Sequence, residues 1–154
     1  MENTIFENSS RTLAARANNN ELVVENLIRR IKYKNIEIVY VDFSNIRSQE
    51  KIFKAMDYAA NYIRQQLPRS IYTLTNITGM YFNTDIFNRI SVYAKQNEPF
   101  VKGSAVVGMS GLMQIFYNSF SRISGREVKA FFSEEEAKEF LLNIQLANNL
   151  KFAQ

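Results

Sequence analysis

The chain has no cysteine and no histidine, and these two absences remove much of the usual catalytic chemistry. Without cysteine there can be no disulfide, no thiolate metal ligand and no cysteine nucleophile. Without histidine, a serine–histidine–acid triad cannot form within one chain. Carboxylates remain, but Asp42, Asp85 and Glu134 are not spaced as a recognisable catalytic or metal-binding pair. We therefore expect no enzyme activity, no cofactor and no metal site.

Long apolar runs are also absent, since no stretch approaches the roughly 18 residues that a membrane span needs. The first residues, Met1–Glu7, are polar and lack the basic and apolar regions of a signal peptide. We therefore expect a cytoplasmic protein. The 154 residues, of which 46% are hydrophobic and 22% charged, are typical of one globular domain that can bury a core.

The excess of positive charge is also small. The net charge is +4, and the positive residues are spread along the chain. The densest basic run is Arg29–Lys34. Nucleic-acid-binding domains usually concentrate basic residues on one surface, so we interpret this run as a solvated face and expect no nucleic-acid partner.

From residue 36 onward, strand-like and helix-like segments alternate. Apolar, β-branched runs predict strands at 36–41, 71–74, 105–107 and 128–131. Apolar residues at helical spacing predict helices over 48–66, from Asn83 to before Pro99, from Ser110 to Gly125, and from the capping box Ser133–Glu136 onward. Strands separated by single helices are mostly parallel. We predict an α/β fold with a mostly parallel four- to five-stranded sheet flanked by helices.

The N-terminal part is less regular. Residues 1–22 show weak periodicity and are rich in Asn and Ser, so we expect a mobile or loosely docked arm before a single domain over 23–154. Residues 21–34 have two interpretations. Their acidic start and basic end suit a helix, whereas Lys34-Asn35 suits the turn of a hairpin that leads into the next strand.

The loops that follow the strands are where such folds gather ligands or partners. Gly108 and Gly111 stand at the ends of one loop, before a helix whose free amides could hold an anion. The lysine of a P-loop is missing, so we favour a plain helix cap with a tight turn. The candidate loop site comprises Asp42, Ser44, Thr78, Gly108 and Gly111. Asp42 lacks the neighbouring acids of a Mg²⁺ site, and we expect it to hydrogen-bond loop amides.

The helix predicted from Ser110 is apolar on more than one face, which exceeds the single stripe that a surface helix buries. Its apolar residues are Leu112, Met113, Ile115, Phe116, Tyr117, Phe120 and Ile123. Central burial accounts for this pattern, and so does a homodimer or partner face, where exposed aromatic residues and Met are common.

Four segments resemble a known family: Ile38–Ser44, Tyr72–Gly79, Lys102–Gly111 and Phe131–Ala137. They are similar to bacterial STAS-like domains, that is, anti-sigma-factor antagonists and related SEC14-type proteins. The resemblance implies a regulatory domain that acts by protein–protein interaction with a signalling or anti-sigma partner. The SEC14-type kinship implies the alternative, a small-molecule or lipid-binding α/β domain.

In the antagonists, a partner kinase phosphorylates the serine of an Asp-Ser pair at a helix start. The matching place here is Phe82–Asp85, where the pair is absent and Thr84 is the nearest hydroxyl. The resemblance therefore makes Thr84 the candidate phospho-switch. The candidate interaction surface, through which we also expect self-association, comprises Asn83, Asp85, Ser110, Met113, Phe116, Tyr117 and Phe120.

Overall fold

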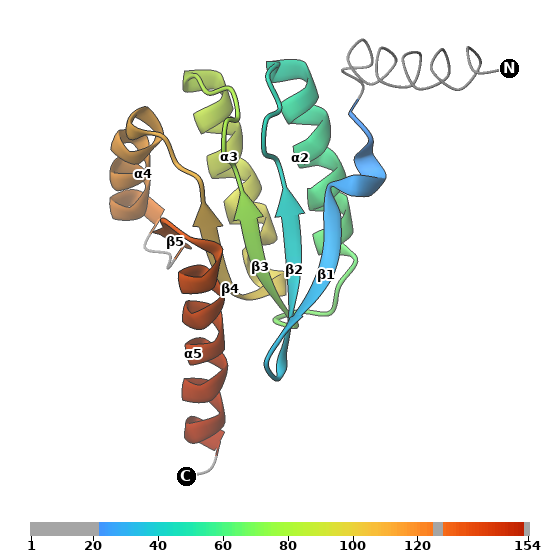
Figure 1. The fold of residues 1–154 in the computed structure, drawn as a ribbon, viewed down its shortest axis with the longest axis vertical. Helices are drawn as coiled ribbons and strands as arrows, with labels where there is room; N and C mark the ends of the chain where they lie inside the picture. The colour runs from blue at the N-terminus through green and yellow to red at the C-terminus, as the bar shows by residue number, and fades with distance from the viewer. Residues whose placement is uncertain (1–21, 125–127, 153–154) are drawn as a thin grey trace, which may run out of the picture.

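The computed structural model describes residues 22–124 and 128–152 and shows an α/β fold built on one five-stranded sheet, in the order β1-β2-β3-β4-β5 (Figure 1). The strands are β1 (Ile28–Tyr33), β2 (Ile36–Asp42), β3 (Ile71–Asn76), β4 (Val101–Val107) and β5 (Val128–Phe131). The first pair is antiparallel and every later pair is parallel. The predicted α/β class and mostly parallel sheet are confirmed.

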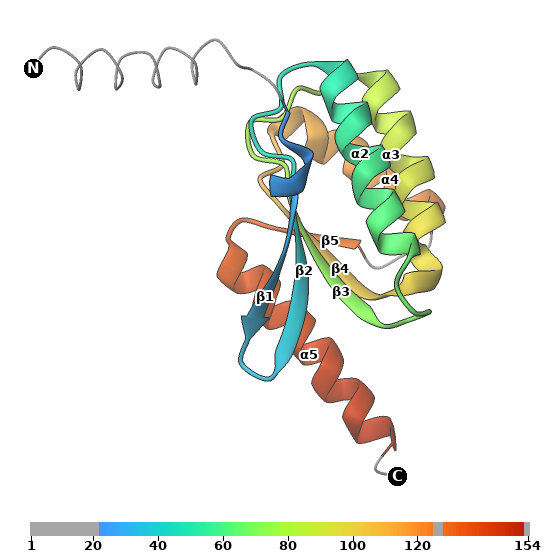
Figure 2. The ribbon, with the colours of Figure 1, turned by 90° about the vertical axis from the view of Figure 1, so that its right-hand side faces the viewer.

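Helices cover both faces of the sheet. They are α2 (Gln49–Arg64), α3 (Thr84–Asn97), α4 (Gly111–Ser124) and α5 (Glu134–Phe152), with short 3₁₀ helices η1 (Val24–Asn26) and η2 (Glu98–Phe100). Figure 2 shows α2, α3 and α4 on one face and α5 on the other. Neighbouring parallel strands joined in sequence by crossovers of one hand place their helices on the same face. The last helix follows the last strand and is free of that constraint.

Two apolar cores form on the two faces because successive side chains of β2 point to opposite sides. Val39 and Val41 are buried in the core under α2, α3 and α4, which we name the three-helix core. Ile38 and Tyr40 are buried in the core against α5. The continuous apolar run of this strand is thus explained by coverage on both faces, as the sequence predicted.

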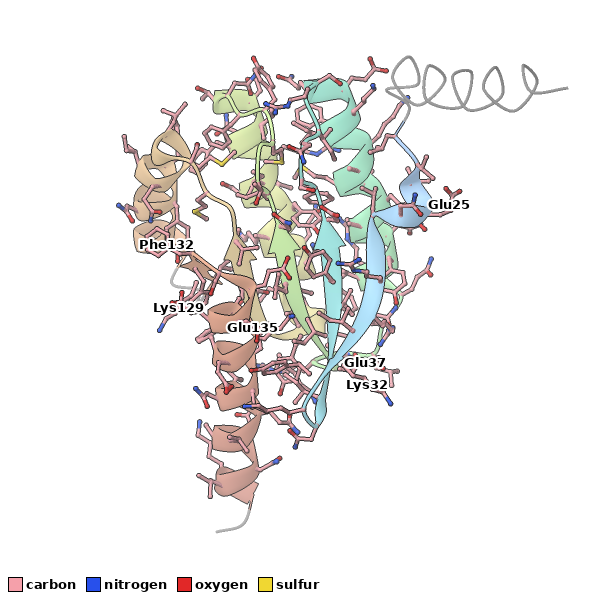
Figure 3. All side chains as sticks on the ribbon, viewed as in Figure 1. Glu25, Lys32, Glu37, Lys129, Phe132 and Glu135 are labelled. Carbon is pink, nitrogen blue, oxygen red and sulfur yellow. The ribbon has the colours of Figure 1, made fainter. Side chains whose placement is uncertain are left out.

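The segment before β2 is a hairpin strand, so the helical interpretation of residues 21–34 is wrong for the described part. Residues Ile28–Tyr33 pair with β2, and Lys34 adopts a positive φ of 50° in the turn. Lys32 lies opposite Glu37 across the hairpin (Figure 3), and opposite charges in this position favour pairing. The charge pattern that suggested a helix dipole is instead that of an exposed edge strand.

The predicted helix starts are confirmed by their caps. Ser48 Oγ accepts the Lys51 amide at 3.3 Å, Asn83 Oδ1 accepts the Ile86 amide at 2.9 Å, and Ser133 Oγ accepts the Glu136 amide at 3.2 Å. These polar side chains satisfy backbone amides that have no partner within their helix. The arm before residue 22 and the predicted helix end at Gly125 lie outside the described residues.

Candidate functional site

The loops at the carboxyl ends of β2, β3 and β4 lie side by side, at the edge of the sheet where α2, α3 and α4 begin (Figure 1). We name it the carboxyl edge. Backbone hydrogen bonds continue there beyond the strands, from the Phe43 amide to the Asn76 carbonyl at 2.9 Å and from the Asn45 amide to the Thr78 carbonyl at 2.8 Å. The loops are therefore held in register with one another.

The same turn occurs at the ends of β2 and β3. Asp42 Oδ1 accepts hydrogen bonds from the Ser44 amide at 3.0 Å and the Ser44 hydroxyl at 2.5 Å. Asn76 Oδ1 accepts from the Thr78 amide at 3.0 Å and the Thr78 hydroxyl at 2.7 Å. The expectation that Asp42 hydrogen-bonds a loop amide is confirmed. Because both hydroxyls donate to these side chains, the geometry supports turn formation better than anion binding.

The glycines of the candidate loop site differ in their surroundings. Gly108 has a φ of +91°, and a Cβ on it would lie 2.2 Å from Thr78 Oγ1. A Cβ on Gly111 would meet nothing within 4 Å. Ser110 Oγ accepts the Met113 amide at 3.3 Å, as expected of a plain helix cap. Gly108 is therefore a packing requirement, whereas Gly111 is the open first residue of α4.

The polar side chains at the start of α3 are either hydrogen-bonded within the fold or exposed to solvent. Asn83 caps the helix and also donates from Nδ2 to Gln49 Oε1 at 2.7 Å, which ties α3 to the start of α2. Thr84 and Asp85 are exposed in the first turn, and Tyr81, just before the cap, is 46% exposed. Asn83 is thus a structural residue, whereas the Thr84 hydroxyl is accessible from solvent.

Helix α4 turns several of the residues proposed for the interaction surface inward. Met113 is only 5% exposed. The ring centroid of Phe116 lies 5.3 Å from that of Phe82 and 5.0 Å from that of Phe87. Tyr117 donates its hydroxyl hydrogen to the Val128 carbonyl. These side chains join α4 to α3 and β5, and the side chain of Phe120 lies outside the described part.

Among the described side chains of α4, the exposed apolar ones are instead Leu112 and Ile115, with 54% and 66% of their surface accessible. Sequence reasoning included both in the apolar pattern but did not assign them to the surface. The contact between Phe82 and Phe116 places α4 beside the start of α3, and the Tyr81 amide donates to the Ile46 carbonyl at 2.9 Å in the loop before α2. Exposed apolar side chains thus occur in the first turns of α4 and just before α3, and an exposed threonine begins α3.

A polar network on the α5 side of the sheet was not predicted. The Tyr40 hydroxyl donates to Glu134 Oε1 at 2.5 Å and accepts from Asn76 Nδ2 at 3.0 Å. Burial, and then the hydrogen bond to Glu134, raise the pKa of Tyr40 to about 12. The network joins β2, β3 and α5.

The described residues were compared with what a metal site and a membrane span require. Across 22–124 and 128–152, no three acidic side chains gather as a metal site would need. Each helix in the same part of the chain is too short or too polar to cross a membrane.

Comparison with known proteins adds no further assignment. A scan against protein-family models, a search of curated proteins and a search of solved structures found no match for this chain. The structure itself shows an α/β domain with a mixed five-stranded sheet flanked by helices.

Proposed function

We propose that this chain is a STAS-like, non-enzymatic regulatory domain that binds a protein partner through its carboxyl edge. The observation that carries the proposal is the exposure of apolar side chains just before α3 and in the first turns of α4: Tyr81, Leu112 and Ile115 are 46%, 54% and 66% exposed. Protein interfaces are enriched in aromatic and large apolar residues of this kind, whereas charged residues are depleted from their centres. We name Tyr81, Thr84, Asp85, Leu112 and Ile115 the edge surface.

The surface is supported from beneath by aromatic contacts and a hydrogen bond. Phe116 packs against Phe82 and Phe87, so α4 and the start of α3 form one unit. Asn83 extends that unit to α2 through its hydrogen bond to Gln49. A partner that binds here therefore meets a preformed surface, which lowers the entropic cost of binding.

Thr84 gives this surface a place for regulation. Its side chain is exposed at the first position of α3. A phosphate there would be favoured by the positive end of the helix dipole and opposed by the neighbouring Asp85. Added charge on the edge surface would change the affinity for an apolar partner surface. The resemblance to anti-sigma-factor antagonists suggests a signalling or anti-sigma partner, and self-association would use the same surface.

The proposal is tested by recovering tagged protein from its native cells and measuring bound partners and oligomeric mass. Leu112→Asp places a carboxylate in the first turn of α4, where the dipole tolerates it, so the fold should persist. Leu67→Asp is the matched control, because Leu67 is 77% exposed after α2 at the opposite edge of the sheet. We expect Leu112→Asp to lose the partner or the self-association and Leu67→Asp to retain it.

Thr84 is tested separately with Thr84→Glu and Thr84→Val. We expect Thr84→Glu to change the affinity for the recovered partner. Thr84→Val keeps the shape of the side chain but cannot be phosphorylated, so its partner binding in cells should no longer be regulated by phosphorylation. If folded Leu112→Asp and Ile115→Asp proteins keep every partner and the same mass, contact through this surface is refuted.

A further inference from the structure

A cavity of about 140 Å³ lies inside the three-helix core, between β3 and β4 on one side and α2, α3 and α4 on the other. Its walls are mostly apolar, and Phe87, Ile90, Met109 and Met113 are among the residues that line it. Well-packed protein interiors contain few voids larger than a water molecule. A cavity of this size is therefore a feature that requires an explanation.

The cavity also has polar residues in its wall, including Asn97, Thr73 and Ser104. Asn97 is 4% exposed, and within the described part of the chain its Oδ1 is the one buried side-chain nitrogen or oxygen that lacks a hydrogen-bond partner. Buried polar atoms are nearly always hydrogen-bonded, because leaving one unsatisfied is costly. An amide oxygen without a partner beside a cavity indicates that a donor belongs there.

Tyr93 is a hydrogen-bonding partner of Asn97, and two hydroxyls line the same cavity. The Asn97 side chain hydrogen-bonds the phenol of Tyr93, whose pKa is raised by burial and lowered in part by this bond. The hydroxyls of Thr73 and Ser104 are 2.9 Å apart and share one hydrogen bond, which leaves lone pairs of both oxygens available. Asn97 and this hydroxyl pair are therefore hydrogen-bonding groups set in a mostly apolar wall.

We propose that this cavity is a binding site for a small apolar molecule with a single hydroxyl or N–H group, of about the size of phenol. The apolar walls would enclose its body, and Asn97 Oδ1 would accept its hydrogen bond. This site lies within the three-helix core, with Asn97 at the end of α3 away from the carboxyl edge, and it is independent of the protein contact proposed above.

The volume defines the ligand class. A cavity of about 150 Å³ in another protein binds benzene, whereas drug-sized ligands occupy pockets of roughly 300–1,000 Å³. At about 140 Å³, this cavity matches a single substituted ring or a short branched alcohol and excludes an intact phospholipid.

The test is a titration of the full chain with phenol and with toluene, followed by two-dimensional NMR. The two probes have nearly the same shape, but only phenol donates a hydrogen bond. We expect saturable binding of both, with phenol tighter by roughly five- to tenfold, as one added hydrogen bond provides. Shifts should concentrate on residues that line the cavity.

Two variants and one matched control test the hydrogen bond to Asn97 and the cavity separately. Asn97→Leu should remove the preference for phenol while toluene still binds. Ala94 lines the cavity on α3, and Ala94→Leu should fill it and abolish binding of both probes. Ala147→Leu makes the same change on an exposed part of α5 and should bind as the wild type does.

Each of the following results would overturn one part of the ligand-site proposal. If neither probe binds the wild-type protein, or if folded Ala94→Leu protein binds both probes unchanged, the cavity is not a ligand site. If phenol and toluene bind equally to the wild type, Asn97 does not accept a hydrogen bond from the ligand, and the proposed ligand class is wrong.

Discussion

Replacing Gly108 by alanine should strongly destabilise the domain, because the loop after β4 crosses Thr78 with no room for a side chain. A Cβ at Gly108 would lie 2.2 Å from Thr78 Oγ1, 2.5 Å from the Thr78 amide nitrogen and 2.7 Å from its Cα. Two of these three atoms belong to the backbone, so a side-chain rotation cannot remove the overlap.

The magnitude has two sources. The φ of Gly108 is +91°, a conformation that costs a residue with a side chain about 1–3 kcal/mol. Inserting a methyl group into a packed position typically costs about 1–3 kcal/mol more. Thr78 cannot easily move away, because its carbonyl accepts the Asn45 amide at 2.8 Å. We therefore expect a loss of about 2–6 kcal/mol, which is a large share of the stability of an ordinary domain.

Urea unfolding of matched variants measures this loss. Gly111→Ala is the control, because its Cβ meets nothing within 4 Å, and we expect it to be neutral or slightly stabilising. Adding Thr78→Ala to Gly108→Ala removes only the hydroxyl contact and should restore part of the stability. A Gly108→Ala protein as stable as Gly111→Ala would refute the close approach of the two loops.

Three further perturbations test other parts of the structure. Tyr40→Phe removes the hydrogen bonds to Glu134 and Asn76 and should lower the free energy of unfolding by about 1–3 kcal/mol in urea titrations; no change would contradict the network. Because the pKa of Tyr40 is raised to about 12, the unfolded chain releases this proton from about pH 10 while the folded chain retains it. The free energy of unfolding should therefore fall as the pH rises from about 10 to about 12, and Tyr40→Phe should reduce that fall; equal slopes would argue against the raised pKa. Phe132 is fully exposed at 101%, so Phe132→Ser should change the free energy of unfolding by no more than about 0.5 kcal/mol, and a larger loss would reveal a contact at this position (Figure 3).

Much of the fold could be predicted from the sequence because its signals are local. The strand at 36–41 is apolar on both faces, and Ser48, Asn83 and Ser133 mark helix starts through hydrogen bonds that span only three residues. The hairpin before β2 could not be decided in the same way. Its basic end and its turn residues fit a helix or a strand equally, and only the pairing of Arg29 with Tyr40 and its neighbours selects the strand.

The candidate site was less predictable because it depends on contacts between distant segments. The apolar excess of α4 was visible, but the sequence could not show which of its residues face α3. Phe116 faces Phe82 and Phe87, which come from a segment about thirty residues earlier. Asn97 gave no signal at all, because an asparagine near a helix end is ordinarily a solvated residue.

The described apolar side chains of α4 occupy three separate environments along one helix. Met113 and Tyr117 line the cavity, Phe116 packs against α3, and Leu112 and Ile115 are exposed at the carboxyl edge. A helix that packed only against the core would need one apolar stripe. A helix that formed only an interface would not need apolar residues on the face that lines the cavity. The composition of α4 therefore fits a helix with a ligand cavity beneath it and a protein surface above it, and the two proposals explain different residues of the same element.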